Sequence, residues 1–216
     1  MTLGASLVEA RMRIATGALI AAVLMVLGQV AHAAPPSERE AKTLLAMPKG
    51  STSLGRTNDG QLLGAVQLAP QGKGYTVLSH AVGRRTNFGA TELIDAITRA
   101  TTAVREAFPG SLLGIGNLGF ESGREIPWSV SHQAGRDADL GMYAVTLEGK
   151  PVQAMPFYRF DADGLANGPG GRKVKFDLAR NLALVVALAE DREARVQYVF
   201  VAAWLKEKLL AEARKA

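Results

Sequence analysis

The segment WSVSHQAGRDADLG at positions 128–141 holds the densest group of potential metal ligands in this 216-residue chain. His132 and Asp139 stand seven positions apart, which on one helix is two turns, or roughly 10 Å of rise. Two ligands of one zinc ion must each lie about 2 Å from the metal, so a continuous helix cannot supply both. A turn at Gly135 followed by an extended strand predicts that His132 comes to lie beside Asp139.

Alternation along that strand decides which side chains face the site. Residues two apart in an extended strand share a face. Asp137 and Asp139 are therefore expected on one face, whereas Ala138 and Leu140 face the other way, toward a core. The residues alone thus indicate half of a zinc site, with His132 and Asp139 as ligands.

Three further motifs lie upstream of this segment: RRTNFG at 84–89, IGNLG at 115–119 and SGREIPWS at 122–129. Together with SHQAGRDAD at 131–139, they resemble the penicillin-insensitive murein endopeptidases of the LAS group of metallopeptidases. That group also includes D-alanyl-D-alanine dipeptidases and carboxypeptidases. The similarity runs from about Gly50 to the end of the chain.

The resemblance implies a single α+β domain with a mainly antiparallel central sheet flanked by helices, and Zn2+ as cofactor. In the family, the histidine and the last aspartate of the motif are zinc ligands, which correspond to His132 and Asp139. The third ligand and a histidine that serves the catalytic step come from a downstream His-x-His segment. This sequence contains only His32, His80 and His132. We therefore assign no catalytic residue within the chain and expect it to be truncated before that segment.

Other polar residues near the motif are candidates for binding substrate or supporting the metal. The resemblance implies that Ser131 and Gln133 shape the site. Arg136 could pair with a carboxylate of a peptide substrate, or form a surface salt bridge. Asp137 could orient a metal ligand from outside the coordination shell, touch substrate, or be solvated. His80 is expected to be an exposed residue at a strand end.

The N-terminus has the order of a secretory signal peptide. Scattered charges precede an apolar run over positions 14–30, and the triplet Ala-His-Ala follows at 31–33. We expect residues 1–33 to be a signal peptide, 34–49 a linker and 50–216 the endopeptidase-like domain. An uncleaved membrane anchor is the alternative, because about 17 apolar residues is near the lower limit for a span. The protein is therefore predicted to be exported and periplasmic.

Composition limits the stabilising chemistry and the partners. The chain has no cysteine, so its stability must come from its core and from any bound metal. Its formal net charge is +5, but no basic run or aromatic ladder typical of nucleic-acid binding is present. We expect peptidoglycan peptides as partners, no nucleic acid, and membrane contact only through an uncleaved leader.

Hydrophobic periodicity predicts the elements of the domain. Helices are expected over 90–108, over 177–190 and from 202 onward; strands over 62–68, 75–80, 111–115, 137–145 and 195–201; and loops over 49–60 and 156–172. Within the last loop, Asp-Ala-Asp-Gly at 161–164 favours an Asx-type turn over a calcium loop, because further oxygen ligands and a closing glutamate are missing.

The resemblance implies a zinc-dependent peptidoglycan endopeptidase that hydrolyses D-alanyl-diaminopimelate cross-links. One alternative is a non-catalytic peptidoglycan-binding fragment, or a degenerate relative, that lacks the third zinc ligand. The other is a D-alanyl-D-alanine carboxypeptidase or dipeptidase of the same group, which would share the metal chemistry but act on a different substrate.

Overall fold

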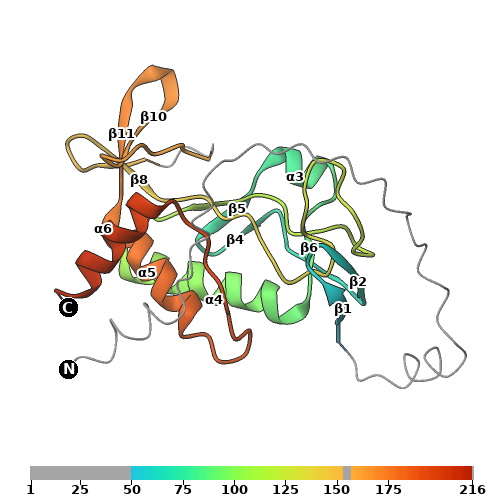
Figure 1. Cartoon of the computed structure of the whole chain (residues 1–216). Coiled ribbons are helices and arrows are strands. Elements are labelled where there is room, and N and C mark those ends of the chain that lie inside the picture. The colour runs from blue at the N-terminus through green and yellow to red at the C-terminus, as the bar shows by residue number, and fades with distance from the viewer. Residues whose placement is uncertain (1–49, 153–156, 216) are drawn as a thin grey trace, which may run out of the picture.

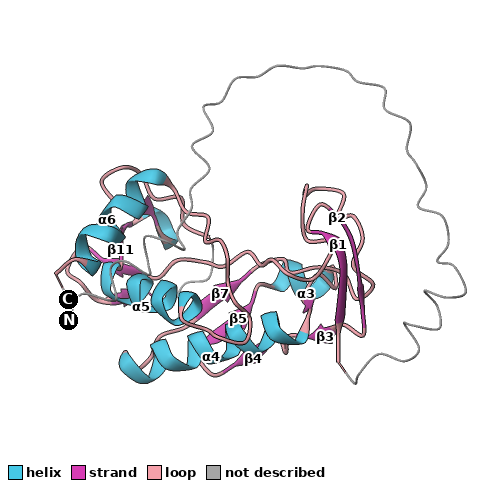
Figure 2. Cartoon of the chain, turned by 60° about the horizontal axis from the view of Figure 1, so that its bottom comes forward, coloured by secondary structure: helices cyan, strands magenta, loops and turns pink. Residues whose placement is uncertain are grey.

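The computed structural model describes residues 50–152 and 157–215. The predicted signal peptide (1–33) and linker (34–49) lie outside these residues. Within the described part of the chain, no helix is long and apolar enough to span a bilayer. A hairpin of residues 52–63 lies at one end of the molecule and the C-terminal helix at the other (Figures 1 and 2).

Three helices bury apolar faces and confirm the helical predictions to within a residue or two at their starts. They are α4 (Thr91–Ala107), α5 (Leu178–Ala189) and α6 (Ala203–Ala213). Helix α4 packs against α5, and α5 packs against α6. Asp177 caps the start of helix α5, because its Oδ1 accepts a hydrogen bond from the backbone N–H of Arg180 at 3.2 Å. This side-chain cap fixes where the helix starts.

The strands form two larger sheets and two pairs. One larger sheet has the order β4 (Gln71–Gly72), β5 (Tyr75–Val77), β7 (Leu113–Ile115), and the other has the order β10 (Leu165–Asn167), β11 (Lys173–Phe176), β8 (Ala144–Thr146), β9 (Pro151–Val152). The pairs are β1 (Thr52–Arg56) with β2 (Asp59–Leu63), and β3 (Val66–Gln67) with β6 (Phe88–Gly89).

Only the pairing of β5 with β7 is parallel among these ladders of the described chain. The segment between them contains the short helix α3 (Ser79–Gly83), β6 and helix α4. Such a crossover is what a parallel pair requires. The predicted α+β fold of mainly antiparallel strands flanked by helices is confirmed.

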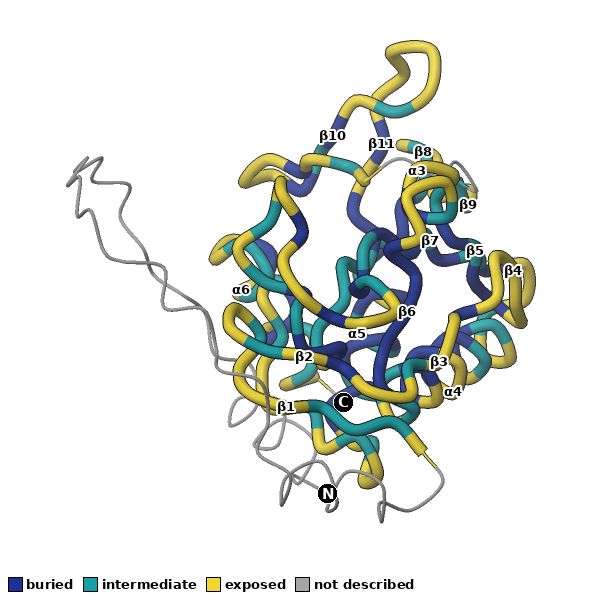
Figure 3. The backbone as a smooth tube through the Cα atoms, turned by 90° about the vertical axis from the view of Figure 1, so that its right-hand side faces the viewer, coloured by how far each residue is buried: buried dark blue, intermediate teal, exposed yellow. Residues whose placement is uncertain are grey.

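Two hydrophobic clusters form the core. The first lies between α4 and the sheet of β5 and β7, and the second lies between β8, β11 and α6. Helix α5 contributes Leu184 and Leu188 to the first cluster and Val185 to the second. Helix α5 therefore joins both halves into one domain. The buried residues lie along the middle of the molecule (Figure 3).

The prediction of a loop over residues 49–60 is wrong. Strands β1 and β2 form a regular hairpin there, with Thr52 opposite Leu63 and Arg56 opposite Asp59. Small polar residues hid the hairpin, because a backbone ladder needs no apolar alternation when another segment covers it. Ser53 Oγ donates a 2.5 Å hydrogen bond to the carbonyl of Ala134, in the segment covering the hairpin.

Several predicted strands are also shorter than expected or absent. Residues 137–145 form only an isolated bridge at Leu140, followed by β8. His80 lies in helix α3 and is exposed, so it does not end a strand. Residues 195–201 pair with no strand of the described chain; Val199 and Val201 pack on the second cluster while Phe200 is exposed. Val196 packs on the first cluster, so the apolar residues of this segment contact the core without a β-ladder.

The predicted loop over 156–172 contains structure that its composition concealed. Strand β10 pairs with β11 and the turn between them contains the 3-10 helix η1 (Pro169–Gly171). This hairpin projects from the body of the molecule (Figure 1). The Asx-type turn is confirmed, because Asp161 Oδ1 accepts hydrogen bonds from the N–H groups of Asp163 at 3.0 Å and Leu165 at 2.8 Å.

Candidate functional site

The long connection between β7 and β8 folds back on itself and carries the candidate site. Its two arms are held by backbone hydrogen bonds, Gly116 N to Asp139 O at 2.8 Å and Asp139 N to Asn117 O at 2.8 Å. Between the arms, Gly135 adopts φ +66°, and its carbonyl accepts from Ala90 N–H at 2.9 Å. The turn at this glycine allows residues from both arms to meet.

His132 lies inside this folded connection and is only 4% exposed. Its backbone is left-handed, with φ +70°, a conformation that costs energy in residues with a side chain. Its Nδ1 is 3.1 Å from the carbonyl oxygen of Leu118, and its Nε2 is 3.3 Å from Asp139 Oδ1. The carbonyl can only accept, so Nδ1 carries a proton and donates to it. Nε2 faces Asp139, and the hydrogen bond there is the one that a metal ion would replace.

Asp139 is held from the side opposite His132. Asn117 Nδ2 donates to Asp139 Oδ2 at 3.2 Å, and Thr86 Oγ1 donates to Asn117 Oδ1 at 2.8 Å. Thr86 is fully buried, so this chain of hydrogen bonds is anchored in the protein interior. Thr86 and Asn117 lie within the motifs at 84–89 and 115–119, which was the available sign that they belong to the site.

Asp137 lies against the other nitrogen of the imidazole. Its Oδ2 accepts from the backbone N–H of His132 at 3.0 Å and lies 3.1 Å from His132 Nδ1. Asp137 and Asp139 therefore flank opposite sides of the ring and do not converge on one point. Among the described residues, no group of three histidine, cysteine, aspartate or glutamate side chains is arranged to hold a metal ion.

The pair shifts both pKa values toward the charged forms. Burial lowers the pKa of His132, but the hydrogen bond to Asp139 and the negative charges of Asp137 and Asp139 raise it by more. Burial raises the pKa of Asp139, but the hydrogen bonds from His132 and Asn117 lower it by more. Each partner thus stabilises the charge of the other.

The distance within the pair also fits a shared metal ion. Two ligands that each lie about 2.0 Å from a tetrahedral zinc ion are about 3.3 Å apart. The Nε2–Oδ1 distance of 3.3 Å matches this edge, and it is longer than a strong charge-assisted hydrogen bond. The Leu118 carbonyl and Asn117 supply the outer hydrogen bonds that ligating histidines and carboxylates use. The pair therefore suits two positions of a zinc site.

The three polar residues predicted to bind substrate have different surroundings. Gln133 is tied to the β1–β2 hairpin, because its Oε1 accepts from Gly60 N–H at 3.4 Å and its N–H donates to Thr57 O at 2.9 Å. Arg136 Nη2 donates to the carbonyl of Gly55 in the same hairpin. Ser131 lies next to His132 and is half-buried. Gln133 and Arg136 thus fasten the hairpin to the site loop.

Comparison with known proteins gives two matches. Residues 53–216 match the family model described as penicillin-insensitive murein endopeptidase. The chain is also 30% identical over 175 residues to a penicillin-insensitive murein endopeptidase of Pectobacterium atrosepticum, an alignment that covers 78% of this chain and 59% of the relative. The chain thus spans about 59% of the length of that relative. The match over most of the chain shows that the protein belongs to the penicillin-insensitive murein endopeptidase family.

Proposed function

We propose that this chain supplies two zinc ligands, His132 and Asp139, to an exported, periplasmic endopeptidase that hydrolyses D-alanyl-diaminopimelate cross-links of peptidoglycan. The observation that carries the proposal is the 3.3 Å approach of His132 Nε2 to Asp139 Oδ1, which has the length of a zinc-site edge. Family membership supports the peptidoglycan substrate.

The residues of the chain would prepare this pair for a metal. The Leu118 carbonyl fixes the His132 tautomer, and Asn117 orients the Asp139 carboxylate. When bound, zinc lowers the pKa of a water ligand to about 7 and polarises a carbonyl group. Asp137 acts from outside the coordination shell, because it lies at Nδ1 and cannot reach a metal bound at Nε2.

Substrate contacts near the pair are assigned by whether each side chain is already hydrogen-bonded to the β1–β2 hairpin. Ser131 stands one residue before His132, and we propose that its hydroxyl contacts the peptide. Gln133 and Arg136 act indirectly, by holding the β1–β2 hairpin beside the site. We assign no third zinc ligand among the described residues.

A second candidate is a protein that binds peptidoglycan without cutting it. The observation that favours it is the lack of a third convergent ligand among the described residues. Two protein ligands hold zinc weakly, since catalytic sites use three. The two candidates share a fold and a pair and differ in metal affinity and turnover.

Zinc titration of the full 216-residue chain tests the proposal. We expect weak one-to-one binding by isothermal titration calorimetry, loss of that binding in His132→Ala and Asp139→Asn, and no change in the control Asp163→Asn, which alters an exposed carboxylate. A chain whose zinc binding survives both site substitutions would refute the ligand assignment. Incubation with cross-linked muropeptides, followed by mass spectrometry, then separates a hydrolase from a binder.

A further inference from the structure

An open hollow of about 570 Å³ lies on the same two loops that build the His132–Asp139 pair. Arg84 and Arg85 line one side of it, and the rest of its wall comes from Phe120, Glu121, Ser122, Arg124, Glu125 and Pro127. Arg85 directly precedes Thr86, whose hydroxyl begins the hydrogen-bond chain to Asp139. The volume falls within the range of sites for small ligands. The hollow and the proposed metal site are therefore built from the same backbone segments.

The cations of the hollow are not equally available. Arg85 Nη2 is 2.9 Å from Glu121 Oε2, so its charge is already paired. Arg84 has no carboxylate partner among the described residues, and its guanidinium lies 4.5 Å from the centre of the Trp128 ring. Stacking of this kind holds the planar group while leaving its edge donors free for a bidentate ligand.

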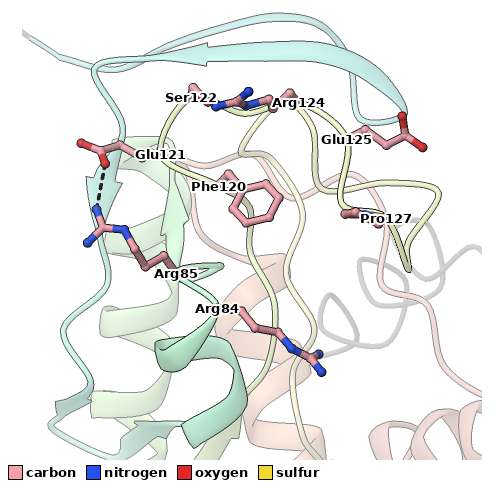
Figure 4. A pocket seen from close by; sticks show the side chains of 8 residues that line it. All are labelled: Arg84, Arg85, Phe120, Glu121, Ser122, Arg124, Glu125 and Pro127. Carbon is pink, nitrogen blue, oxygen red and sulfur yellow. Dashed lines mark hydrogen bonds and ion pairs between the residues drawn. The ribbon is translucent and has the colours of Figure 1, made fainter.

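A second unpaired cation lies across the hollow. Arg124 Nε donates to Ser122 Oγ at 3.0 Å, and no carboxylate of the described chain pairs with Arg124. Figure 4 shows the Phe120 ring between Arg84 on one side and Ser122 with Arg124 on the other. The hollow thus has Phe120 at its centre and an unpaired guanidinium at each of two edges, and the Glu125 carboxylate also lines it.

The backbone around the hollow is held in costly conformations. Arg85 and Arg124 have φ +56° and +68°, and His132, in the same β7–β8 connection as Arg124, has φ +70°. Of the described non-glycine residues with positive φ, only Arg195 lies outside these two loops. Backbone strain from a positive φ persists only where surrounding contacts fix the conformation, and such residues concentrate at ligand-binding sites.

We propose that this hollow is a carboxylate-binding subsite, in which Arg84 grips a carboxylate of a peptide while the Phe120 ring contacts the peptide's aliphatic part. The inference rests on the proposed function for its ligand, a peptidoglycan stem peptide. The C-terminal carboxylate, the side-chain carboxylate of diaminopimelate and the α-carboxylate of the γ-linked D-Glu all have the required chemistry. Arg84 and Arg124 lie on opposite sides of Phe120, so Arg124 adds a second positive charge to the same hollow.

The test measures binding of the stem peptide L-Ala-γ-D-Glu-diaminopimelyl-D-Ala to the full chain in the presence of EDTA, without any metal. The fluorescence of Trp128 reports peptide binding, because its ring stacks on Arg84. All proteins in the assay carry Trp204→Phe, which removes the chain's second tryptophan. We expect a saturable fluorescence change. Arg84→Gln should weaken binding about tenfold, whereas the control Arg172→Gln, at an exposed hairpin turn, should leave it unchanged.

Three peptides, each amidated at one carboxyl, identify the carboxylate that is bound. Amidation of the D-Glu α-carboxyl, the diaminopimelate carboxyl or the C-terminus should weaken binding to the unsubstituted protein about tenfold in one case and leave it nearly unchanged in the other two. The peptide that loses affinity should be insensitive to Arg84→Gln. Arg124→Gln gives an independent reading if Arg84→Gln unfolds the chain, which circular dichroism detects.

Equal binding of all four peptides, unchanged affinity in both arginine variants, or no binding of any peptide would overturn the subsite. Because the assay excludes metal, its failure is separate from that of the proposed function. A chain that binds zinc at His132 and ignores the carboxylate loses only the subsite. A chain that binds the carboxylate but no zinc loses only the metal assignment.

Discussion

The molecule buries two charged clusters that are built in different ways. At the start of α5, Arg180 Nη1 lies 2.6 Å from Asp177 Oδ2, and both side chains are about nine-tenths buried. In the site loop, His132 is buried to a similar degree, but the side chain of its partner Asp139 is 43% exposed. The first pair is sealed from solvent, whereas the second is reachable from one side.

The two clusters also differ in how completely their polar atoms are hydrogen-bonded. Arg180 Nε donates to Ser111 Oγ at 2.9 Å, and its guanidinium lies over the Phe108 ring at 5.6 Å, so the pair closes on itself. In the site loop, Asp137 Oδ1 is buried with no hydrogen-bond partner, and the gap between His132 and Asp139 is 3.3 Å. A buried charge pair is thus structural when helix geometry completes it, and available to a ligand when a strained loop leaves it open.

The largest expected effect comes from breaking the sealed pair. Arg180→Met leaves the carboxylate of Asp177 buried without its cation, and such losses cost about 3–5 kcal/mol of unfolding free energy. Urea denaturation of the full chain measures this loss, with Arg172→Met as the exposed control. A loss below about 1 kcal/mol would show that the sealed pair contributes little to stability.

A smaller effect is expected from the glycine that lets the site loop turn. In Gly135→Ala the new Cβ would lie 2.5 Å from Leu62 Cδ2 and 3.0 Å from Ala90 N, at φ +66°. We expect a loss of about 2–3 kcal/mol, because left-handed strain and crowding add. Gly149→Ala is the matched control, since its φ is +83° but nothing lies within 4 Å of its added Cβ.

Comparing the two alanine variants by thermal unfolding isolates the crowding. Gly149→Ala should lose only the strain of about 1–2 kcal/mol. The same Gly135→Ala protein should also bind zinc more weakly, because the turn sets the approach of His132 to Asp139. Equal losses of stability in the two variants would mean that the turn at Gly135 tolerates a side chain.

The sequence predicted the features that depend on local pattern. The helices followed from apolar spacing, and the turn at Gly135 followed from the need to bring His132 to Asp139. The β1–β2 hairpin escaped prediction because Gln133 and Ala134, far away in sequence, supply its contacts. The role suggested for Arg136 also depended on a tertiary contact, with the Gly55 carbonyl, that spacing cannot reveal.

The surroundings of the pair were less predictable than the pair itself. Asn117 meets Asp139 across 22 positions of sequence, and Thr86 meets Asn117 across 31. The motifs that contain them marked these positions without showing which atoms touch. The availability of Arg84 in the hollow likewise follows from its stacking on Trp128, which no periodicity encodes.

The smallest expected effect is the dependence of stability on pH, and it distinguishes the open pair from the sealed one. The pKa of His132 is raised above its ordinary 6.5, so the stability it contributes is full below pH 6.5 and is lost as pH rises through the raised value. The pKa of Asp139 is lowered from 3.8, so its contribution is present above pH 3.8 and is lost as pH falls through the lowered value. The pair therefore stabilises the metal-free fold most between these limits.

Asp139→Asn removes the charge and keeps the shape, so it should lower the pKa of His132 toward its ordinary value. The difference in unfolding free energy between the parent chain and this variant, measured with EDTA, should be larger at pH 5.5 than at pH 8.5, because the parent loses its charged pair on the way up. For Asp163→Asn, in the exposed Asx-type turn, the difference in unfolding free energy from the parent chain should be the same at both pH values. A difference that stays constant across this range would mean that His132 carries no proton in the folded chain at pH 5.5, and the 3.3 Å contact would then be held by the loop alone.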